Sequence, residues 1–252
     1  NLLHHNEAMN KLVEYIKGAD NLIICSAITR TTGDDVDTCF VNLEQIKTIL
    51  AACRQLPPKN IVYLSAADVY GHGGIDVDES TTALNPMNDY GAFKVFTEHL
   101  LRVNLSHISN LVILRFSGVF GGIDDCTSLI YRFVETIKAN RTISLSNNGK
   151  SIRDFVPIRL LTEVTFQLTE CKHNGIFNVS TGESIDIISV VKLIAKQLSR
   201  HPQVNLKLSP HVSERDFDLS LSNKKLTEAL HDIHVPQVSG AIASFVGDIN
   251  NE

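Results

Sequence analysis

The order of helix-like and strand-like segments over residues 1–121 is the feature that most constrains the fold. Three amphipathic segments have apolar residues at helical spacing, at residues 6–20, 41–53 and 90–103. They alternate with three short, largely apolar runs: "NLIICSA", "NIVYLSA" and "NLVILRFSGVFG". Such runs are typical of parallel strands that are covered on both faces. The alternation therefore predicts right-handed βαβ units and an α/β fold with a parallel sheet.

After Gly121 the alternation is less regular. Helices are expected over 128–140, 160–171, 185–199 and 223–232, and we expect the last of these to be the final firm helix. The stretch "RTISLSNNGKSIRDFVPI" predicts two short strands around an Asn-Asn-Gly turn, and "GIFNVS" predicts one more strand. Because no long linker separates the halves, we expect the second half to pack onto the first as a lobe that covers the substrate.

Bulk composition argues against several classes of function. The net charge of −5 provides no basic footprint for nucleic acid, and no apolar run reaches the roughly 20 residues that a membrane helix needs. Five cysteines without a CxxC pair predict reduced, buried or half-buried thiols in a cytoplasmic protein. The ten histidines form no HxxxH or HxxEH pattern. We therefore expect no metal, no nucleic acid and no membrane as partners.

Tyr90 and Lys94 stand four residues apart in "DYGAFK", which places both on one face of the predicted helix. A free tyrosine has a pKa near ~10, and a nearby ammonium moves it towards neutrality, where proton transfer is most effective. A solvated Tyr–Lys pair is the structural alternative, since this spacing is common in helices. The context favours chemistry, because the helix lies between two strands and ligands of open α/β sheets bind at the carboxyl ends of strands.

Several motifs, taken in order, resemble those of the extended short-chain dehydrogenases/reductases, specifically the NAD-dependent nucleotide-sugar epimerase/dehydratase/reductase group. "LSAADVYG" resembles the family's SSxxVYG, "DYGAFK" its catalytic YxxxK, and "LRFSGVFG" its LRxxNVYG. "GKSIRDFVPIRLLTEV" is similar to RDFVHVDDVA, and "ERDFDLSLSNKKLTEAL" to RxxDxSKxxxxL. The resemblance covers nearly the whole chain, and the joint order and spacing of the motifs are specific.

The resemblance implies a Rossmann-like doubly wound parallel sheet with a smaller C-terminal α/β substrate-binding lobe. Residues 1–121 would be the remainder of the dinucleotide-binding domain, with 153–170 returning to it. Residues 122–252 would mainly form the substrate-binding lobe. The implied cofactor is NAD or NADP.

The same resemblance assigns roles to individual residues. Tyr90 would be the general acid/base, and Lys94 its partner and a ligand of the cofactor ribose. The other cofactor-binding residues that it implies are Ser26, Ala27, Asn42, Phe116 and Val119. Arg153 and Arg215 would clamp a nucleotide-diphosphate sugar, a role that suits guanidinium geometry. Ordinary strand-end packing is the alternative for the first five, and surface ion pairs are the alternative for the two arginines.

One departure from the family pattern concerns a hydroxyl. Ala66 stands where the family has a catalytic Ser or Thr. Ser65 is one residue earlier and is expected to point away, because a strand alternates its faces. Asp68, a water, Thr81 or Thr82 would then have to take the place of the hydroxyl. Ser65 and Asp68 are kept as candidate substrate-binding residues.

Two further differences narrow the reaction. The Asp-Glu pair of the 4,6-dehydratases appears here as Ala67-Asp68, which disfavours a dehydratase. Gly118 replaces an Asn that often touches substrate in the family.

The glycine-rich dinucleotide fingerprint does not occur in the sequence, since "GHGG" at 71–74 leads into an acidic loop. Aligned to the family, the chain begins after the third strand, and roughly 55 residues of the pattern lack a counterpart. The missing strands would pair beside "NLIICSA", whose edge would otherwise be open and prone to aggregation. We expect a chain whose N-terminus was removed or never included. The alternative is a short protein that dimerises over the open edge.

Two functions are compatible with these residues. The first is an NAD(P)-dependent nucleotide-sugar epimerase or 4-keto-sugar reductase, in which Tyr90 moves a proton and the nicotinamide exchanges a hydride at the same carbon. The second is a binding or regulatory member of the family that kept Tyr90 and Lys94 but lost the hydroxyl. Family members often dimerise through the Tyr helix and its neighbour, so "VFTEHLL" and "IKTILAAC" suggest a homodimer, although core packing explains their apolar residues equally well.

Overall fold

The computed structural model describes residues 2–122, 128–200, 204–214 and 216–250. The chain divides into two compact units. The first unit consists of residues 1–71, 83–115 and 165–177. The second unit consists of residues 72–82, 116–164 and 178–252.

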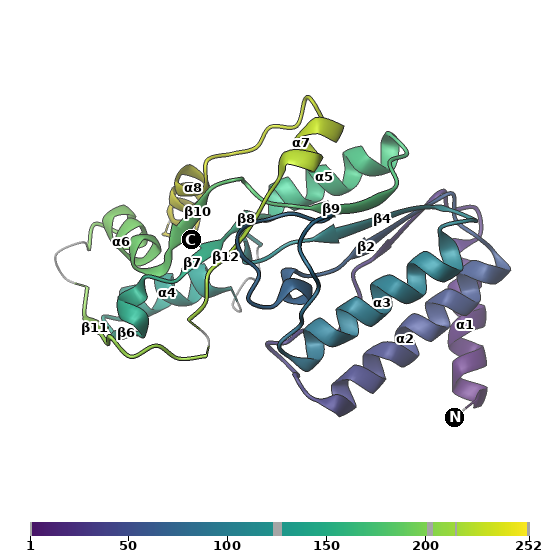
Figure 1. Ribbon diagram of the computed structural model, residues 1–252, viewed down its shortest axis with the longest axis horizontal. Helices are drawn as coiled ribbons and strands as arrows, with labels where there is room; N and C mark the ends of the chain where they lie inside the picture. Colours follow the sequence, from purple (N-terminus) through teal and green to yellow (C-terminus); the bar gives the residue numbers. More distant parts are fainter. Residues whose placement is uncertain (1, 123–127, 201–203, 215, 251–252) are drawn as a thin grey trace. The chain divides into compact units, whose positions relative to one another are not determined.

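A four-stranded sheet in the order β1-β2-β4-β9 forms the centre of the first unit (Figure 1). Its strands are β1 Asn21–Ile24, β2 Asn60–Leu64, β4 Asn110–Arg115 and β9 Gly175–Asn178. The first three run parallel in one register, with their opening asparagines side by side. The Nδ2 of Asn60 donates to the Oδ1 of Asn21 at 2.7 Å, and the Nδ2 of Asn110 to the Oδ1 of Asn60 at 2.9 Å. The predicted parallel sheet is confirmed, and because the strands share a register, their carboxyl ends lie at one edge.

Three helices accompany this sheet: α1 Leu2–Ile16, α2 Val36–Gln55 and α3 Asp89–Leu105. In Figure 1, α2 and α3 lie side by side along one face of the sheet. Asp35 caps α2 by accepting from the backbone N of Thr38 at 2.7 Å, and Asn88 caps α3 by accepting from the backbone N of Gly91 at 2.7 Å. All three predicted helices are confirmed, and the Asp35 cap explains why α2 begins before the predicted residue 41.

The core of the first unit lies between the sheet and the helices α2 and α3. Alternate strand residues face these helices: Leu22, Ile24, Ile61, Tyr63, Leu111 and Ile113. The residues between them in the two inner strands, including Val62, Val112 and Leu114, are buried as well. The inner strands β2 and β4 are therefore covered on both faces, as predicted.

Strand β1 differs from this prediction. Ile23 is 48% exposed, and among the described residues β1 pairs with β2 alone. The strand is thus an open edge of the sheet in the described part of the chain. An edge strand keeps one row of backbone groups unpaired, which is why the covering expected for "NLIICSA" is incomplete.

The second unit contains three sets of strands. A four-stranded sheet has the order β10-β7-β12-β3, and two parallel pairs join β11 to β6 and β5 to β8. The strands are β3 Gly74–Val77, β5 Val119–Phe120, β6 Ile143–Leu145, β7 Ile152–Asp154, β8 Val156–Pro157, β10 Ser184–Asp186, β11 Leu206–Leu208 and β12 Leu219–Leu221.

The helices of the second unit are α4 Leu129–Lys138, α6 Ile187–Gln197, α7 Lys224–Ala229 and α8 Val238–Asn250, while α5 Ile158–Glu170 begins in this unit and ends in the first. One apolar core joins α4, α6 and α8, with Val134, Ile194 and Ile242 fully buried in it. Two short 3₁₀ turns, Ala67–Tyr70 and Asn147–Gly149, complete the elements.

Two predictions for the second half were wrong in detail. The strands on either side of the Asn-Asn-Gly turn exist, but they do not pair with each other: β6 pairs with β11, and β7 with β10 and β12. Asn147 and Asn148 have positive φ values, which turn the chain without closing a hairpin. The helix at Lys224–Ala229 is also not the last, because the 13-residue α8 follows it.

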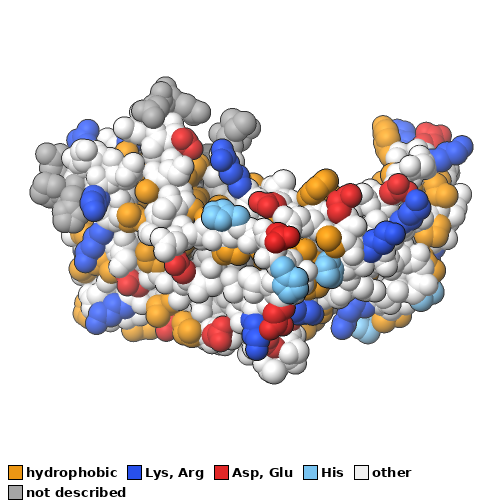
Figure 2. Space-filling view, turned by 90° about the horizontal axis from the view of Figure 1, so that it is seen from above, with side chains coloured by type: hydrophobic (Ala, Val, Ile, Leu, Met, Phe, Trp, Pro, Cys, Tyr) orange, Lys and Arg blue, Asp and Glu red, His pale blue; other side chains and the backbone are white. Residues whose placement is uncertain are grey.

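The chain changes from one unit to the other after residues 71, 82, 115, 164 and 177. The second half was expected to begin at 122, with 153–170 returning to the first half; the structure changes unit after Arg115 and returns over 165–177. In the part of the chain that the structure describes, no helix has both the length and the apolar character to cross a membrane. Figure 2 shows Lys and Arg side chains interspersed with Asp and Glu over the visible face.

Candidate active site

The candidate site lies in the first unit, where the segments that follow β1 and β2 meet the first turns of α3. Residues 25–35 follow β1, and the 3₁₀ turn Ala67–Tyr70 follows β2. Gly91, in the first turn of α3, permits the close approach, because a Cβ at this position would lie 2.7 Å from the backbone O of Asp68. Larger residues cannot occupy this position without moving the helix away from the turn.

Lys94 is a predicted site residue whose charged side chain is buried. Its side chain is on α3, the residue is 3% exposed, and its Nζ donates to the backbone O of Leu64 at 2.7 Å. The Nζ also lies 4.6 Å from the centre of the Tyr63 ring and 5.4 Å from that of Tyr90. Burial lowers the pKa of Lys94 to about 8, although Glu98 and Asp68 act in the opposite direction. The ammonium is therefore mostly protonated at neutral pH.

Tyr90 lies one helical turn before Lys94, as the sequence predicts. The residue is half-buried. Burial raises the pKa of its phenol to about 12; the charge of Asp68 adds to this shift, and the charge of Arg30 opposes it. The expectation that the lysine would bring the phenol towards neutrality is thus wrong for the protein by itself. The physical reason is that desolvation of the phenolate outweighs the favourable charges around it.

Asp68 connects three segments of the candidate site. Its Oδ1 accepts from the Nη1 of Arg30 at 2.7 Å and from the Nδ2 of Asn88 at 3.2 Å. Arg30 follows β1, Asp68 follows β2, and Asn88 is the cap of α3. The sequence motifs gave no indication of Arg30. The signal that could have found it is its place three residues after Ala27, just beyond the carboxyl end of a strand.

Three predicted cofactor-binding residues lie in or against the segment that follows β1. Asn42 is 2% exposed and clamps this segment, since its Oδ1 accepts from the N of Ile28 at 2.8 Å and its Nδ2 donates to the O of Ile28 at 3.0 Å. Ser26 is exposed, and Ala27 packs partly against the core. The amide of Asn42 therefore orders the segment, while Ser26 is open to solvent.

Ser65 points into the protein, as the alternation of the strand predicts. Its Oγ donates to the Oε1 of Glu98 at 2.5 Å, and both residues are 1% exposed. Arg115 donates to the same carboxylate from its Nε at 3.0 Å and its Nη2 at 2.6 Å, and its Nη1 donates to the hydroxyl of Tyr70 at 2.9 Å. We call Ser65, Tyr70, Glu98 and Arg115 the buried ionic cluster. The hydroxyl of Ser65 belongs to this cluster, and the neighbouring Ala66 is a buried apolar residue.

The remaining predicted residues lie in the second unit. Phe116 is half-buried, and Val119 pairs with Val156 in β5 and β8. The guanidinium of Arg153 lies 4.2 Å from the centre of the Phe217 ring, and its Nη1 donates to the O of Ile152 at 2.9 Å. Arg215 lies outside the described residues.

The two threonines considered as replacements for the hydroxyl lie in a local turn. Thr81 donates through its Oγ1 to the Oδ1 of Asp78 at 3.3 Å, and the Oγ1 of Thr82 accepts from the N of Asp78 at 3.2 Å. Both side chains thus support the turn that follows β3.

The cysteines are free thiols in the described part of the chain, but their exposure differs from the prediction. Cys53 is buried and Cys39 half-buried, whereas Cys25 and Cys171 are exposed. Cys25 follows the last residue of the edge strand β1, which explains its exposure. Among the described residues, no three His, Cys, Asp or Glu side chains are grouped so as to hold a metal ion.

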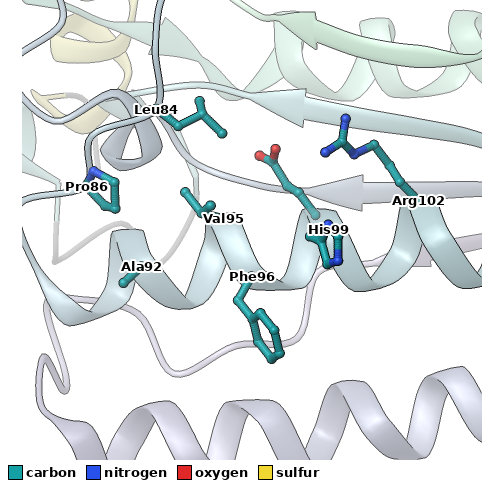
Figure 3. Close-up of a pocket in the computed structure, with 8 residues that line it drawn as sticks. Leu84, Pro86, Ala92, Val95, Phe96, His99 and Arg102 are labelled. Carbon is teal, nitrogen blue, oxygen red and sulfur yellow. The ribbon is translucent and has the colours of Figure 1, made fainter.

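A groove of about 390 Å³ lies beside α3 and extends from Pro86 and Ala92 to His99 and Arg102 (Figure 3). Its lining is apolar at one end, where Leu84, Pro86 and Val95 lie, and carries His99 and Arg102 at the other. Phe96, which also lines it, is 48% exposed. The outer surface of α3 is therefore apolar enough to be covered by another protein surface.

Comparison with protein families gives a match to the model of the NAD dependent epimerase/dehydratase family over residues 3–180. An uncharacterized UDP-glucose epimerase of Bacillus subtilis is 28% identical over 61% of this chain and 49% of its own length. A dTDP-4-dehydro-6-deoxyglucose reductase of Escherichia coli is 28% identical over 65% of this chain and 53% of its own length. The chain thus spans about half the length of these curated relatives.

Solved structures agree in fold. The UDP-glucuronic acid 4-epimerase of Bacillus cereus, in complex with UDP-glucuronic acid and NAD, superposes with a TM-score of 0.82 at 20% identity, over 94% of this chain and 78% of that one. The UDP-N-acetylglucosamine 4-epimerase of the same organism gives a TM-score of 0.80 at 18% identity, over 96% and 82%. These similarities confirm the predicted Rossmann-like fold class.

Proposed function

Because this chain belongs to the NAD-dependent epimerase/dehydratase family, we propose that it acts on a nucleotide-diphosphate sugar, as a C4 epimerase or a 4-keto-sugar reductase. Tyr90 is the acid/base and Lys94 is its partner. The observation that carries the proposal is the buried ammonium of Lys94, held on the O of Leu64 at 2.7 Å, one turn after Tyr90 at the carboxyl ends of parallel strands.

The residues of the first unit fit a nicotinamide cofactor, and we propose NAD. The ammonium of Lys94 has three N–H groups. Among the described residues it donates one hydrogen bond, to the O of Leu64, so N–H groups remain for ribose hydroxyls. Ser26 and Ala27 belong to the segment that Asn42 orders. Phe116 and Val119, which belong to the second unit, are further candidates on the family resemblance alone. When bound, the cofactor supplies the hydride chemistry, and its oxidised ring adds a positive charge that favours the phenolate of Tyr90.

The protonation state of Tyr90 suits the role of a proton donor. At neutral pH the phenol is protonated, so it donates a proton to the oxygen of a keto sugar. Epimerisation also requires the reverse transfer, in which the phenolate accepts the proton of a sugar hydroxyl. Lys94, whose Nζ lies 5.4 Å from the centre of the Tyr90 ring, is proposed to stabilise the phenolate that this second transfer requires.

Substrate recognition is proposed for Asp68, Arg153 and Arg215. The planar guanidinium of Arg153 packs on the ring of Phe217, which fixes its orientation for a diphosphate. Ser65 was the fourth candidate, but its hydroxyl is committed to Glu98, and the proposed mechanism does not use it.

A binding or regulatory protein is the second candidate function. Ala66 favours it, because the hydroxyl that the family uses is replaced by a buried methyl group and Ser65 faces the interior. Restoring the hydroxyl with Ala66→Ser separates the two functions. Turnover rises if the protein is an enzyme that is slowed by the missing hydroxyl. It stays at the background level if the site binds the nucleotide sugar without converting it.

We further propose a cytoplasmic homodimer. The exposed thiols of Cys25 and Cys171 suit a reducing compartment. For the dimer, Phe96 and Val103 on α3 and Phe40 on α2 are exposed apolar residues. "IKTILAAC" contributes to the core instead, since Ile46, Leu50 and Cys53 are buried in it. Sedimentation of Phe96→Lys against the wild type tests the dimer: the variant is expected to be monomeric.

The proposed activity is tested by calorimetry and by turnover. NAD is titrated into this chain and into the full translation product of its gene, and UDP- and dTDP-sugars are then assayed for epimerisation and reduction. We expect NAD binding, and a loss of turnover of at least about 100-fold in Tyr90→Phe with unchanged cofactor affinity. Turnover that survives in Tyr90→Phe contradicts the assigned role of the phenol. Absence of NAD binding in both proteins contradicts the enzyme and leaves the binding function.

A further inference from the structure

Arg30 brings a positive charge to the candidate site from a segment outside the helix of Tyr90 and Lys94. Its Nη1 donates to the Oδ1 of Asp68 at 2.7 Å, and the two side chains are 51% and 22% exposed. Among the described residues this is the one hydrogen bond of the guanidinium, which has five N–H groups in all. Arg30 therefore keeps donors that point to no protein acceptor in the described chain.

The position of Arg30 is held through Asp68. The same Oδ1 of Asp68 accepts from the Nδ2 of Asn88 at 3.2 Å, while the Oδ1 of Asn88 accepts from the N of Gly91 at 2.7 Å. Asp68 is thus joined to the first turn of α3, which carries Tyr90. These hydrogen bonds hold Arg30 close to the first turn of α3, which carries Tyr90.

The phenol of Tyr90 experiences both members of this ion pair. Asp68 raises its pKa and Arg30 lowers it, after the larger effect of burial. The other charged groups near Tyr90 are Lys94, whose Nζ lies 5.4 Å from the ring centre, and Asp34, whose Oδ1 accepts from the backbone N of Tyr90 at 3.1 Å. Asp89 precedes Tyr90 on α3, and its backbone O accepts from the thiol of Cys39 on α2 at 3.2 Å. Two cations therefore lie near Tyr90: Lys94, from the same helix, and Arg30, from the loop after β1.

An ion pair this exposed contributes little to folding stability, because water screens it and two long side chains must be held in place. A guanidinium with spare donors that is joined through Asp68 and Asn88 to the first turn of α3 is well suited to hold a polar ligand. It can hydrogen-bond a neutral oxygen and stabilise negative charge that develops on it. Ala66 leaves the site without a hydroxyl that could do the same.

We propose that Arg30, positioned by Asp68, donates a hydrogen bond to the sugar oxygen on which Tyr90 acts, in place of the hydroxyl that is absent at Ala66. The inference rests on the proposed function and names a residue that the family motifs do not include. In this role Arg30 contacts the substrate directly, and Asp68 contributes to substrate recognition by holding Arg30 in place.

The charge coupling between Arg30 and Tyr90 can be measured without cofactor or turnover. The five tyrosines are replaced by 3-fluorotyrosine, and the ¹⁹F resonance that disappears in Tyr90→Phe identifies position 90. Fluorine makes a phenol more acidic, so the titration falls at a lower pH, and circular dichroism verifies that the fold persists. Arg30→Gln is expected to raise the pKa at position 90 by about half a unit. Arg54→Gln, which removes the same charge at the C-terminal end of α2, is the matched control and is expected to leave this pKa unchanged.

A double-mutant cycle tests the role of Asp68. If Asp68 holds Arg30 in place, the shift caused by Arg30→Gln becomes smaller in the Asp68→Asn background. Asp20→Asn, which removes an exposed carboxylate paired with Lys59, is the control background and leaves the shift intact. Equal shifts in Arg30→Gln and Arg54→Gln overturn the proposal for Arg30. Equal shifts in the two backgrounds overturn the positioning role of Asp68.

Measurements of turnover are the second test of the proposal for Arg30. Arg30→Gln is expected to lower kcat by at least about 10-fold, Arg30→Lys to recover part of it, and the effect of Arg30→Gln to shrink when Ala66→Ser supplies a hydroxyl. An undiminished effect in the Ala66→Ser background contradicts the replacement of the hydroxyl. If no nucleotide sugar is turned over at all, the proposed function fails, while the fluorine titration still decides whether Arg30 acts on Tyr90.

Discussion

The first unit contains two arginine–carboxylate pairs that differ in almost every physical respect. Arg115 and Glu98 are both 2% exposed in their side chains, and the guanidinium binds the carboxylate through two nitrogens. Arg30 and Asp68 form a single contact and are 51% and 22% exposed. Ser65 and Tyr70 complete the partners of the buried pair, whereas the exposed pair keeps unused donors. The buried ionic cluster joins α3 to the segments at the ends of β2 and β4, whereas the exposed pair is the one for which we propose contact with the substrate.

Lys94 shares its burial with the first pair and its spare hydrogen-bond donors with the second. It is as buried as the ionic cluster, but its hydrogen-bond partner is the backbone O of Leu64 rather than a carboxylate. A buried charge without a carboxylate partner is costly to the fold, and such groups are concentrated at functional sites. The following predictions compare how much each of these charged groups contributes to the free energy of unfolding and to turnover.

The largest effect is expected in the buried ionic cluster. Glu98→Ala leaves the guanidinium of Arg115 buried without its carboxylate, and it should lower the free energy of unfolding by about 3–5 kcal/mol. Urea denaturation measures the loss. The double variant Glu98→Leu/Arg115→Met should recover much of it, because it removes both charges. A loss below about 1 kcal/mol in Glu98→Ala would show that the pair is not structural.

Lys94→Met is expected to act in the opposite direction. Burial lowers the pKa of Lys94 from 10.5 to about 8, so the variant should be more stable at pH 7 by about 2–3 kcal/mol while turnover is lost. Because the folded pKa is the lower one, the unfolded chain binds more protons between about pH 8 and 10.5, and the wild type gains stability as pH rises through this window. The difference between the two proteins should therefore shrink there. Urea unfolding at pH 7 and pH 10 tests this, and a constant difference would be contrary to it.

Ser65→Ala tests the neutral part of the buried ionic cluster. The variant removes a hydrogen bond of 2.5 Å to a carboxylate, and a loss of about 1–2 kcal/mol in the free energy of unfolding is expected. Thermal or urea unfolding measures it. The matched variant Thr162→Ala removes an exposed hydroxyl that donates to the backbone O of Ile158 and should change stability much less. Equal losses in the two variants would remove the distinction between buried and exposed hydroxyls.

The smallest effect on stability is expected at the exposed pair. Arg30→Gln and Asp68→Asn should each change the free energy of unfolding by less than about 1 kcal/mol, because the pair is largely exposed to water. Urea denaturation at low and at high salt measures this. A loss comparable to that of Glu98→Ala would mean that the pair stabilises the fold, and it would weaken the argument that the pair serves the substrate.

Local patterns were sufficient to predict the framework of the candidate site. The apolar runs gave β2 and β4, and the helical spacing gave α3 with Tyr90 and Lys94 on one face, because periodicity and the helix signals are local properties. The alternation of the strand also predicted that Ser65 points away from the substrate, and its hydroxyl donates to Glu98 in the buried ionic cluster. For the second half, local patterns found β6 and β7 but not their partners.

What the tertiary structure decided concerns contacts between residues that are distant in the chain. Arg30 reaches Asp68 across 38 residues, and β6 pairs with β11 rather than with the neighbouring β7. The pKa of Tyr90 also depends on burial, which spacing within a helix does not reveal. The sequence by itself determined β2, β4, α2 and α3 of the first unit and the place of the Tyr–Lys pair, since these follow from short-range geometry, but it gave no sign of α8. Only the folded chain decided which charges surround that pair, because charge and desolvation act through space and not along the chain.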